Sequence, residues 1–312
     1  MLRRTQTIYV TTDPFFSPRG KVLHRFDQFL AEATQAKMPC VWMTGWTRAQ
    51  LDEPRRRLGQ NHPYIGENGG GVYLPEDYFH LKGSTTIRLG RYTCIPIAKP
   101  QPAAAEALEE LAADLDISVV PLRSLSHREL SQNTGLPARE AELLRQRDFD
   151  ELFFFAGARD VDIEKFRQEA ERRDLTVQRN SQFWSLSCGA DLATGVRELG
   201  ALYDRALRGH ALRVGLQVTP GDGEPSTDRT PWPLSAFDKT LTLAEHSDRL
   251  EKQEEWAEGD DSPESPRDSE EIAREYEKSR DASAPHRNRF NLYSPGVWDD
   301  VRAALGANLP RS

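Results

Sequence analysis

The sequence predicts an α/β fold, a doubly wound parallel sheet carrying an inserted α+β domain. Short β-prone apolar runs alternate with amphipathic helical segments over the first 75 residues. The same alternation returns near 190–220, and the stretch between has a different character. At 312 residues, the chain is long enough for two domains or for one domain with an insertion.

The first part of the chain gives a β-α-β-α-β order. We expect a strand at 6–13, a helix at 23–36, a strand at 39–45, a helix at 47–59, and a strand, glycine turn and strand over 63–75. Thr47 is positioned to cap the second helix. In a doubly wound sheet, functional groups gather at the carboxyl ends of the strands, where Asp13 and Thr44 stand.

The middle of the chain reads as a separate α+β layer. Its expected elements are strand 85–90, helix 103–116, strand 117–122, helix 135–149, strand 151–157, helix 162–174 and paired strands within 176–188. Helix 191–207 and strand 212–218 then return to the first pattern. We therefore predict a core from 1–87 and 188–248, with a cap inserted at 88–187.

The end of the chain divides into an acidic tract and a short helix. Residues 249–289 are poor in aliphatics and rich in Ser, Pro, Asp and Glu, which predicts disorder or a solvated loop that could bind a protein partner. Segment 290–312 predicts a helix that docks on the core through Trp298, Val301 and Leu305.

The composition excludes several classes of function. Residues 251–282 hold 13 acidic and 5 basic residues, an excess that matches the net charge of −8, so the rest is near neutral and predicts no nucleic-acid partner. No apolar run approaches the ~20 residues needed to span a bilayer, and no leader precedes the first strand, which predicts a cytoplasmic protein without a membrane partner. Three scattered cysteines indicate neither a disulfide framework nor a zinc site.

Four segments carry a family resemblance. In chain order they are "HPYIGENGGGVYLPEDYF", "NTGLPAREAELLRQRDFDELF", "FWSLSCGAD" and "SPGVWDDV". Together they resemble the mannosyl-3-phosphoglycerate phosphatases, cap-bearing members of the haloacid-dehalogenase-like (HAD) superfamily. The resemblance implies an HAD-like core with a cap, and a Mg²⁺-dependent phosphatase acting on a small phosphorylated sugar or sugar acid through a phospho-aspartate.

The resemblance gives the opening segment "TTDPFFS" a role. Asp13 matches the nucleophile, and Phe15 stands where the family has its general-acid aspartate. A phenyl ring donates no proton, so a contribution of about 10²–10⁴-fold has no obvious source. The Phe15 carbonyl matches a Mg²⁺ ligand. The alternative is that Asp13 only hydrogen-bonds nearby amides in a turn.

The next two motifs differ in how much they retain. Thr44 matches the hydroxyl residue that holds the phosphoryl group, and Arg48 matches an arginine of the following helix. Thr44 as an ordinary strand-end hydroxyl is the alternative. In "CGADLATG", Leu192 replaces the lysine that offsets the phosphate charge in the family, and a leucine neutralises no charge.

The metal motif is displaced. The resemblance implies Mg²⁺ bound by Asp13, by the Phe15 carbonyl, and by aspartates after strand 212–218. Asp222 and Asp228 are the candidates there, six residues apart where the family has four. A plain Gly/Pro/Asp-rich surface turn is the alternative.

The substrate-facing positions are mixed. The matching residues are Glu67, Asn68, Gly69, Gly70, Thr134, Gly135, Arg147, Asp150 and Arg179. The alternative is that the glycine segment is an ordinary hairpin turn with no role in binding a ligand. Gln182 and Ser185 stand where the family has an arginine and a histidine. Because neither replacement carries a positive charge, recognition of a doubly anionic phosphoglycerate is in question.

Two hypotheses follow. The first is a phosphatase of the HAD type with weakened or altered activity, in which Asp13 attacks phosphorus. The second is a catalytically silent relative that binds a sugar phosphate or a partner enzyme, with Phe15, Phe16 and Trp46 partly filling the phosphate site.

Overall fold

The structure is a computed structural model that describes residues 5–17, 21–81, 85–180, 183–219, 232–244, 289–294 and 296–306. The chain divides into two compact units. The first holds the chain up to Gln217 and the described segment 232–240, and the second is built chiefly from Leu241 onward. No helix in these ranges is both long and apolar enough to cross a bilayer.

A large sheet forms the centre of the first unit. Its strands lie in the order β11-β1-β2-β3-β4-β6-β5. They span Leu212–Thr219, Gln6–Thr11, Cys40–Met43, Tyr64–Gly66, Gly71–Pro75, Tyr92–Pro96 and Ile87–Leu89. The first four run parallel, and β4, β6 and β5 continue antiparallel. The chain order β1, β2, β3 outward from β1, with β11 returning on the other side, is that of a doubly wound sheet.

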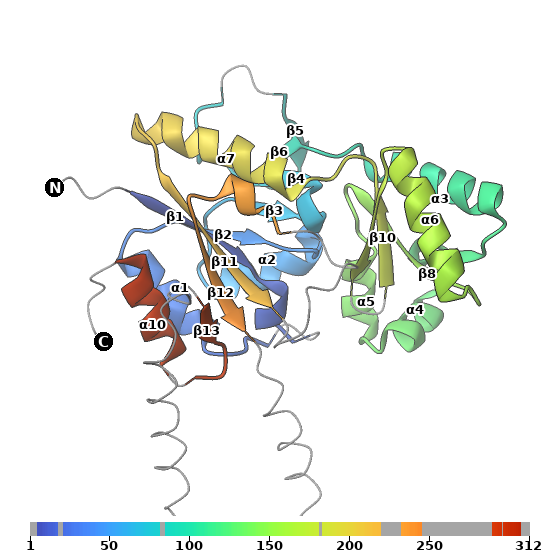
Figure 1. Ribbon diagram of the computed structural model, residues 1–312, viewed down its shortest axis with the longest axis horizontal. Coiled ribbons are helices and arrows are strands. Elements are labelled where there is room, and N and C mark those ends of the chain that lie inside the picture. Colours follow the sequence, from blue (N-terminus) through green and yellow to red (C-terminus); the bar gives the residue numbers. More distant parts are fainter. Residues whose placement is uncertain are drawn as a thin grey trace, which may run out of the picture. The chain divides into compact units, whose positions relative to one another are not determined.

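Helices cover both faces of this sheet (Figure 1). Val41 and Met43 of β2 face one way and pack with Val196 and Leu199 of α7, Leu192–Leu207. Trp42 faces the other way, toward Phe26 of α1, Phe26–Gln35, and toward Arg55 of α2, Arg48–Arg57. Alternation of side chains along one strand thus assigns each helix to its face.

A smaller antiparallel sheet has the order β7-β8-β10-β9. The strands are Val119–Pro121, Asp150–Phe155, Phe183–Ser187 and Thr176–Asn180. Phe153 packs with α3, Gln101–Leu115, and α6, Asp160–Arg172. The adjacent Leu152 packs with α4, His127–Thr134, and α5, Ala138–Leu144. This sheet therefore has its own core on each face. The predicted fold class, a parallel-sheet α/β core with an inserted α+β layer, is confirmed.

The structure differs from the sequence prediction in several elements around the insert. The helix expected at 135–149 is shorter and is α5, Ala138–Leu144. A further helix, α4, His127–Thr134, was not expected, and it ends before α5 because Gly135 takes a positive φ of 66°. β6, Tyr92–Pro96, was not expected, and it joins β5 to β4 within the large sheet. We therefore propose that the insert, predicted at 88–187, begins after β6.

The second unit is small in its described part. β12, Lys239–Ala244, pairs in parallel with β13, Arg289–Asn291, and α10 spans Val297–Leu305. Trp298, Val301 and Leu305 are buried, as amphipathic spacing predicts. Docking of this helix on the core stays a prediction, and the acidic tract at 249–289 lies outside the described residues except for its last position.

Candidate functional site

Two neighbouring strand ends bring Asp13 and Thr44 into contact. β1 and β2 run parallel, and the Thr12 N–H donates to the Met43 carbonyl at 3.0 Å just past their last pair. The Thr44 hydroxyl donates to Asp13 Oδ1, and the Gly45 N–H donates to Asp13 Oδ2 at 2.9 Å. The carboxylate is therefore held by donors on both oxygens.

Burial and the neighbouring donors shift the pKa of Asp13 in opposite directions. Burial raises the pKa of Asp13, and the hydrogen bonds from Thr44 and Gly45 and the charge of Arg147 act to lower it. Burial disfavours the ionised form, whereas donors and a nearby cation favour it. The groups that surround Asp13 thus determine how readily it ionises.

The Phe15 ring lies in the core. It is fully buried and stacks on Phe26, with the ring centroids 4.3 Å apart. The Phe16 ring packs against Trp42 and Trp46 at centroid distances of 5.3 and 5.5 Å. These aromatic side chains stabilise the loop after β1, and none of them can donate a proton to a leaving oxygen.

The glycine turn between β3 and β4 lies beside the same strand end. The Asn68 N–H donates to the Thr44 carbonyl at 3.0 Å. Gly69 has a φ of +98°, and a Cβ there would meet the backbone N of Leu192 at 2.5 Å. Glycine is required at this position by conformation and by the close approach of α7. The turn thus connects the Thr44 loop to the start of α7.

Glu67 binds the loop before β8, and its predicted contact with substrate stays a prediction. Its side chain is fully buried, and its carboxylate accepts from the Asp148 N–H at 2.9 Å and the Phe149 N–H at 2.7 Å. Burial, with the charge of Asp150, raises the pKa of Glu67 to about 8, against the lowering effect of Arg147 and of the Asp148 amide. Glu67 therefore fixes where the 145–149 loop lies.

Arg147 extends from that loop to the Asp13 site. Its guanidinium is 3% exposed and donates from Nη2 to the Gly45 carbonyl at 3.0 Å and to Asp150 Oδ2 at 2.7 Å. Glu67 Oε2 lies 3.9 Å from Nε. Burial alone would lower the pKa of Arg147, but the carboxylates of Asp150 and Glu67 outweigh burial and raise the pKa above its ordinary value. The side chain is therefore charged.

Arg48, also predicted to bind substrate, pairs with the same loop. Its Nε donates to Asp148 Oδ2 at 3.3 Å, and the Tyr73 hydroxyl donates to the same oxygen at 2.9 Å. The Thr47 hydroxyl donates to the Leu143 carbonyl at 3.0 Å. Arg48 thus contributes to the contact between α2 and the insert.

The remaining predicted residues lie within the insert. The buried Thr134 ends α4, where its hydroxyl accepts from the Leu136 N–H at 3.2 Å. Arg179 is exposed on β9, with its guanidinium 6.0 Å from the centre of the Trp184 ring. Ser185, which replaces a family histidine, is buried on β10, and Gln182 lies outside the described residues.

The position of the absent lysine is apolar. Leu192 is 9% exposed and packs in the core between the large sheet and α7. Asp191 caps α7, accepting from the Ala193 N–H at 2.9 Å and the Thr194 N–H at 3.0 Å. Arg197 lies 3.5 Å from Asp191 and is half exposed. This motif therefore functions here as a helix cap.

The predicted magnesium ligands are only partly described. Asp222 and Asp228 lie outside the described residues. Both Asp13 oxygens accept hydrogen bonds, and the Phe15 carbonyl accepts one from the Leu23 N–H at 2.9 Å. Across the described ranges, no three His, Cys, Asp or Glu side chains group to hold a metal. These residues alone do not fit a Mg²⁺ site, and Mg²⁺ binding stays a prediction.

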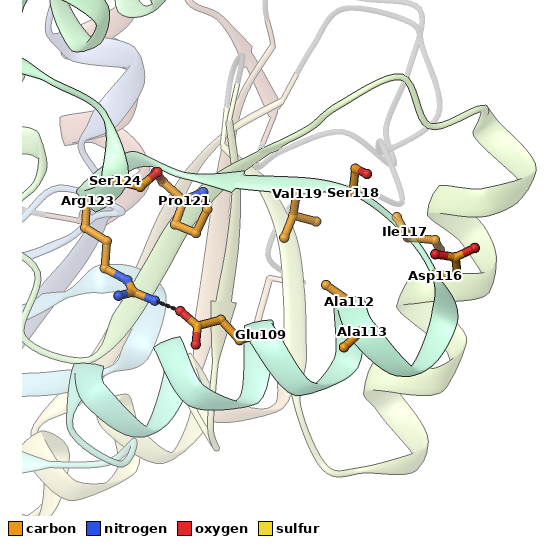
Figure 2. A pocket seen from close by; sticks show the side chains of 10 residues that line it. All are labelled: Glu109, Ala112, Ala113, Asp116, Ile117, Ser118, Val119, Pro121, Arg123 and Ser124. Atoms are coloured by element: carbon orange, nitrogen blue, oxygen red, sulfur yellow. Dashed lines mark hydrogen bonds and ion pairs between the residues drawn. The ribbon is translucent and has the colours of Figure 1, made fainter.

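A surface concavity lies elsewhere, between α3 and β7 in the insert (Figure 2). It encloses about 450 Å³ and is lined by residues between Glu109 and Ser124. Arg123 pairs with Glu109 at one end of it. Its lining includes none of the Asp13, Thr44 or Arg147 side chains. Volume alone therefore does not locate the chemistry of this chain.

The sequence did not single out two residues that organise the site. Gly45 binds Asp13 through its N–H and Arg147 through its carbonyl. Asp148 receives Arg48 and Tyr73. The adjacency of Asp148 to the matched Arg147 was the available signal, but its partners lie about 75–100 residues away in sequence.

Comparison with known proteins identifies relatives of one kind. The chain is 25% identical over 169 residues to a glucosyl-3-phosphoglycerate/mannosyl-3-phosphoglycerate phosphatase of Methanococcoides burtonii, covering 54% of this chain and 62% of that protein. It is 24% identical over 175 residues to a mannosyl-3-phosphoglycerate phosphatase of Pyrococcus furiosus, covering 56% and 69%. The predicted resemblance to this family is confirmed.

Other comparisons are more distant. No family model matches the chain. A solved phosphatase of the haloalkanoate (HAD) superfamily from Bacteroides thetaiotaomicron has a TM-score of 0.48 and 16% identity, covering 77% of this chain and 90% of that one. The match to the Methanococcoides phosphatase spans less than two thirds of that relative's length.

Proposed function

We propose that this chain is a phosphomonoester hydrolase of the HAD type that acts on a small phosphorylated sugar or sugar acid. One observation supports the proposal most strongly. The Asp13 carboxylate stands at the carboxyl end of a central parallel strand, held by Thr44 on one oxygen and by Gly45 on the other. Such strand ends are where doubly wound folds bind ligands, and an oriented carboxylate is a nucleophile for phosphoryl transfer.

The proposed reaction has two steps. A carboxylate oxygen of Asp13 attacks phosphorus, and the bond from phosphorus to the sugar oxygen breaks with its electron pair on that oxygen. Water gives the leaving oxygen its proton, because the Phe15 ring is buried and has none to give. A second water then attacks phosphorus, and the bond from phosphorus to the Asp13 oxygen breaks with its electron pair on the carboxylate. The attacking water gives its proton to the hydroxide left by the first step, so that phosphate is released and Asp13 is restored. We therefore expect slow turnover.

A second candidate function is a silent sugar-phosphate binder. Two observations favour it: Phe15 is stacked in the core where the family has an acid, and Leu192 is buried where the family has a lysine. Electrostatic stabilisation is usually the largest contribution to phosphoryl transfer, so losses here reduce rate more than binding.

The experiment is a phosphate-release assay on the full chain with a panel of sugar phosphates and phosphorylated sugar acids. The wild type is compared with Asp13→Asn, which keeps the side-chain shape and loses the nucleophile. A matched control is Asp116→Asn, which changes a carboxylate at the end of α3. Each assay is run with Mg²⁺ and again after EDTA, because the family resemblance implies a metal requirement.

We expect slow release in the wild type and in Asp116→Asn, and none above background in Asp13→Asn. Release that is equal in the wild type and in Asp13→Asn would contradict the proposal. No release from any substrate, together with a rise in melting temperature on adding a sugar phosphate, would instead support the silent binder.

A further inference from the structure

The backbone donors nearest Asp13 are already used within the protein. The Thr44 N–H donates to the Ile65 carbonyl at 3.1 Å, the Gly45 N–H to Asp13, and the Trp46 N–H to the Thr44 hydroxyl at 3.0 Å. A phosphoryl group transferred to Asp13 carries oxygens that need donors and a positive charge. The loop after β2 offers neither without breaking these bonds.

Arg147 has the donor that this loop lacks. Its side chain is 3% exposed, and its Nη1 is buried with no hydrogen-bond partner in the described structure. Leaving a buried donor unpaired destabilises a protein by about 1–3 kcal/mol, and such groups in native structures call for an explanation. Binding of an anionic ligand atom provides one.

The position of Arg147 relative to Asp13 is fixed by one residue. Gly45 donates its N–H to Asp13 and accepts from Arg147 Nη2 at its carbonyl. Asp150 holds the Nε and Nη2 edge of the guanidinium, which leaves the Nη1 side available. The charge of Arg147 acts on Asp13, although Asp150 and Glu67 also lie beside the guanidinium.

We infer that Arg147, carried by the insert, binds the phosphoryl oxygens at the Asp13 site through Nη1. It thereby supplies the positive charge that a lysine at position 192 would otherwise provide. The inference rests on the proposed function for its catalytic consequence, but anion binding can be measured without turnover. Arg147 is a catalytic residue in this account, because it touches the transferred group.

The test measures the affinity of the full chain for orthovanadate and inorganic phosphate by calorimetry, for the wild type, Arg147→Met and Arg145→Met. Arg145 is the matched control, since it lies on the same loop but donates to Leu125 and pairs with Glu142. Loss of a charge-assisted hydrogen bond weakens binding about 10- to 100-fold. We expect that loss in Arg147→Met and an unchanged affinity in Arg145→Met.

Equal affinities in the wild type and in a folded Arg147→Met would overturn the inference, as would a wild type that binds neither anion. If Arg147→Met does not fold, a wild-type crystal soaked with tungstate decides. An oxyanion within hydrogen-bond distance of Arg147 Nη1 supports the assignment, and an oxyanion at Asp13 without that contact refutes it.

The outcomes separate this inference from the proposed function. Asp13-dependent phosphate release with an Arg147→Met affinity equal to the wild type refutes the role of Arg147 and leaves the hydrolase intact. Arg147-dependent anion binding without phosphate release supports the anion site and contradicts the hydrolase.

Discussion

At the scale of single residues, the Thr44 hydroxyl makes two hydrogen bonds at once. It donates to Asp13 and accepts from the Trp46 N–H at 3.0 Å. This arrangement orients the Asp13 carboxylate and fixes the path of the loop after β2. The resemblance implied that Thr44 holds the phosphoryl group, and the structure adds an orienting contact to Asp13.

Replacing Thr44 by Val keeps the shape and removes both hydrogen bonds. The Trp46 N–H and one Asp13 oxygen would then lose their partner, so we expect the free energy of unfolding to fall by about 1–3 kcal/mol and phosphate release to decrease. Urea denaturation and the release assay measure the two effects. Thr44→Ser keeps the hydroxyl and is the control, and a Val variant equal to Ser in both assays would contradict this account.

Another buried carboxylate, Glu151 on β8, is expected to make stability depend on pH. Burial raises the pKa of Glu151 to about 7, against hydrogen bonding from Gln101 and the charge of Arg123. Between about pH 4.5 and 7 the folded protein therefore holds a proton that the unfolded chain has lost. The stabilisation of the folded protein by this proton is complete below pH 4.5 and is lost as pH rises to about 7. It amounts to at most about 3 kcal/mol.

The measurement is the free energy of unfolding of the wild type and of Glu151→Gln from pH 4.5 to 8. We expect the wild type to lose stability relative to the variant as pH rises through this window, because Gln carries no titrating proton. Parallel curves for the two proteins would show that Glu151 does not titrate in this way.

The sequence predicted part of the site at this scale. The contact between Asp13 and Thr44 follows from parallel strands that end at one edge of a sheet, which a sequence can indicate. The role of Glu67 did not follow, because its partners at 148 and 149 lie about 80 residues away. Long-range packing of the insert loop decides that contact, and no local pattern encodes it.

At the scale of elements, the glycine turn is shaped by its neighbours. A Cβ on Gly69 would meet Asp191 and Leu192 backbone atoms at 2.6 and 2.5 Å. Gly59 also has a positive φ, +63°, but nothing lies within 4 Å of its Cβ position. A substitution at Gly59 therefore tests backbone strain alone, whereas a substitution at Gly69 tests the same strain together with a steric clash.

We expect Gly59→Ala to lower the free energy of unfolding by about 1 kcal/mol through strain alone. Gly69→Ala adds a clash with the start of α7 to the same strain, so its loss should exceed that of Gly59→Ala by about 1–3 kcal/mol. Urea denaturation compares the two variants. Equal losses would mean that α7 shifts freely away from the turn.

Elements with strong periodicity were predicted well, and short ones were not. α1 followed from its apolar stripe, and α3 from its alanine-rich sequence. α4 was missed because it has only eight residues, of which Leu130 and Thr134 are buried, although Ser126 and Glu129 form a capping box before it. β6 was missed because "YTCIP" has no clear alternation and ends in proline.

At the scale of the whole molecule, the order of elements predicted the architecture. The alternation of strands and helices predicted the doubly wound sheet, and the change of pattern near the middle predicted the insert. We propose that the insert begins later than the predicted residue 88, because β5 and β6 belong to the large sheet. Pairing with β4 through β6 assigns β5 to the large sheet.

The insert and the large sheet converge on the Asp13 site through the 145–149 loop. Glu67 and Arg48 bind Asp148, and Gly45 binds Arg147. The proposed site is therefore assembled from two layers, with Asp13, the proposed nucleophile, from the large sheet and the charged Arg147 from the insert.

The most direct test is mass spectrometry of the full chain after acid quenching during incubation with a turned-over sugar phosphate. We expect a phosphoryl adduct on the peptide that contains Asp13, present in the wild type and absent from Asp13→Asn. Phosphate release by the wild type with no adduct at Asp13, or with an adduct on another residue, would contradict it.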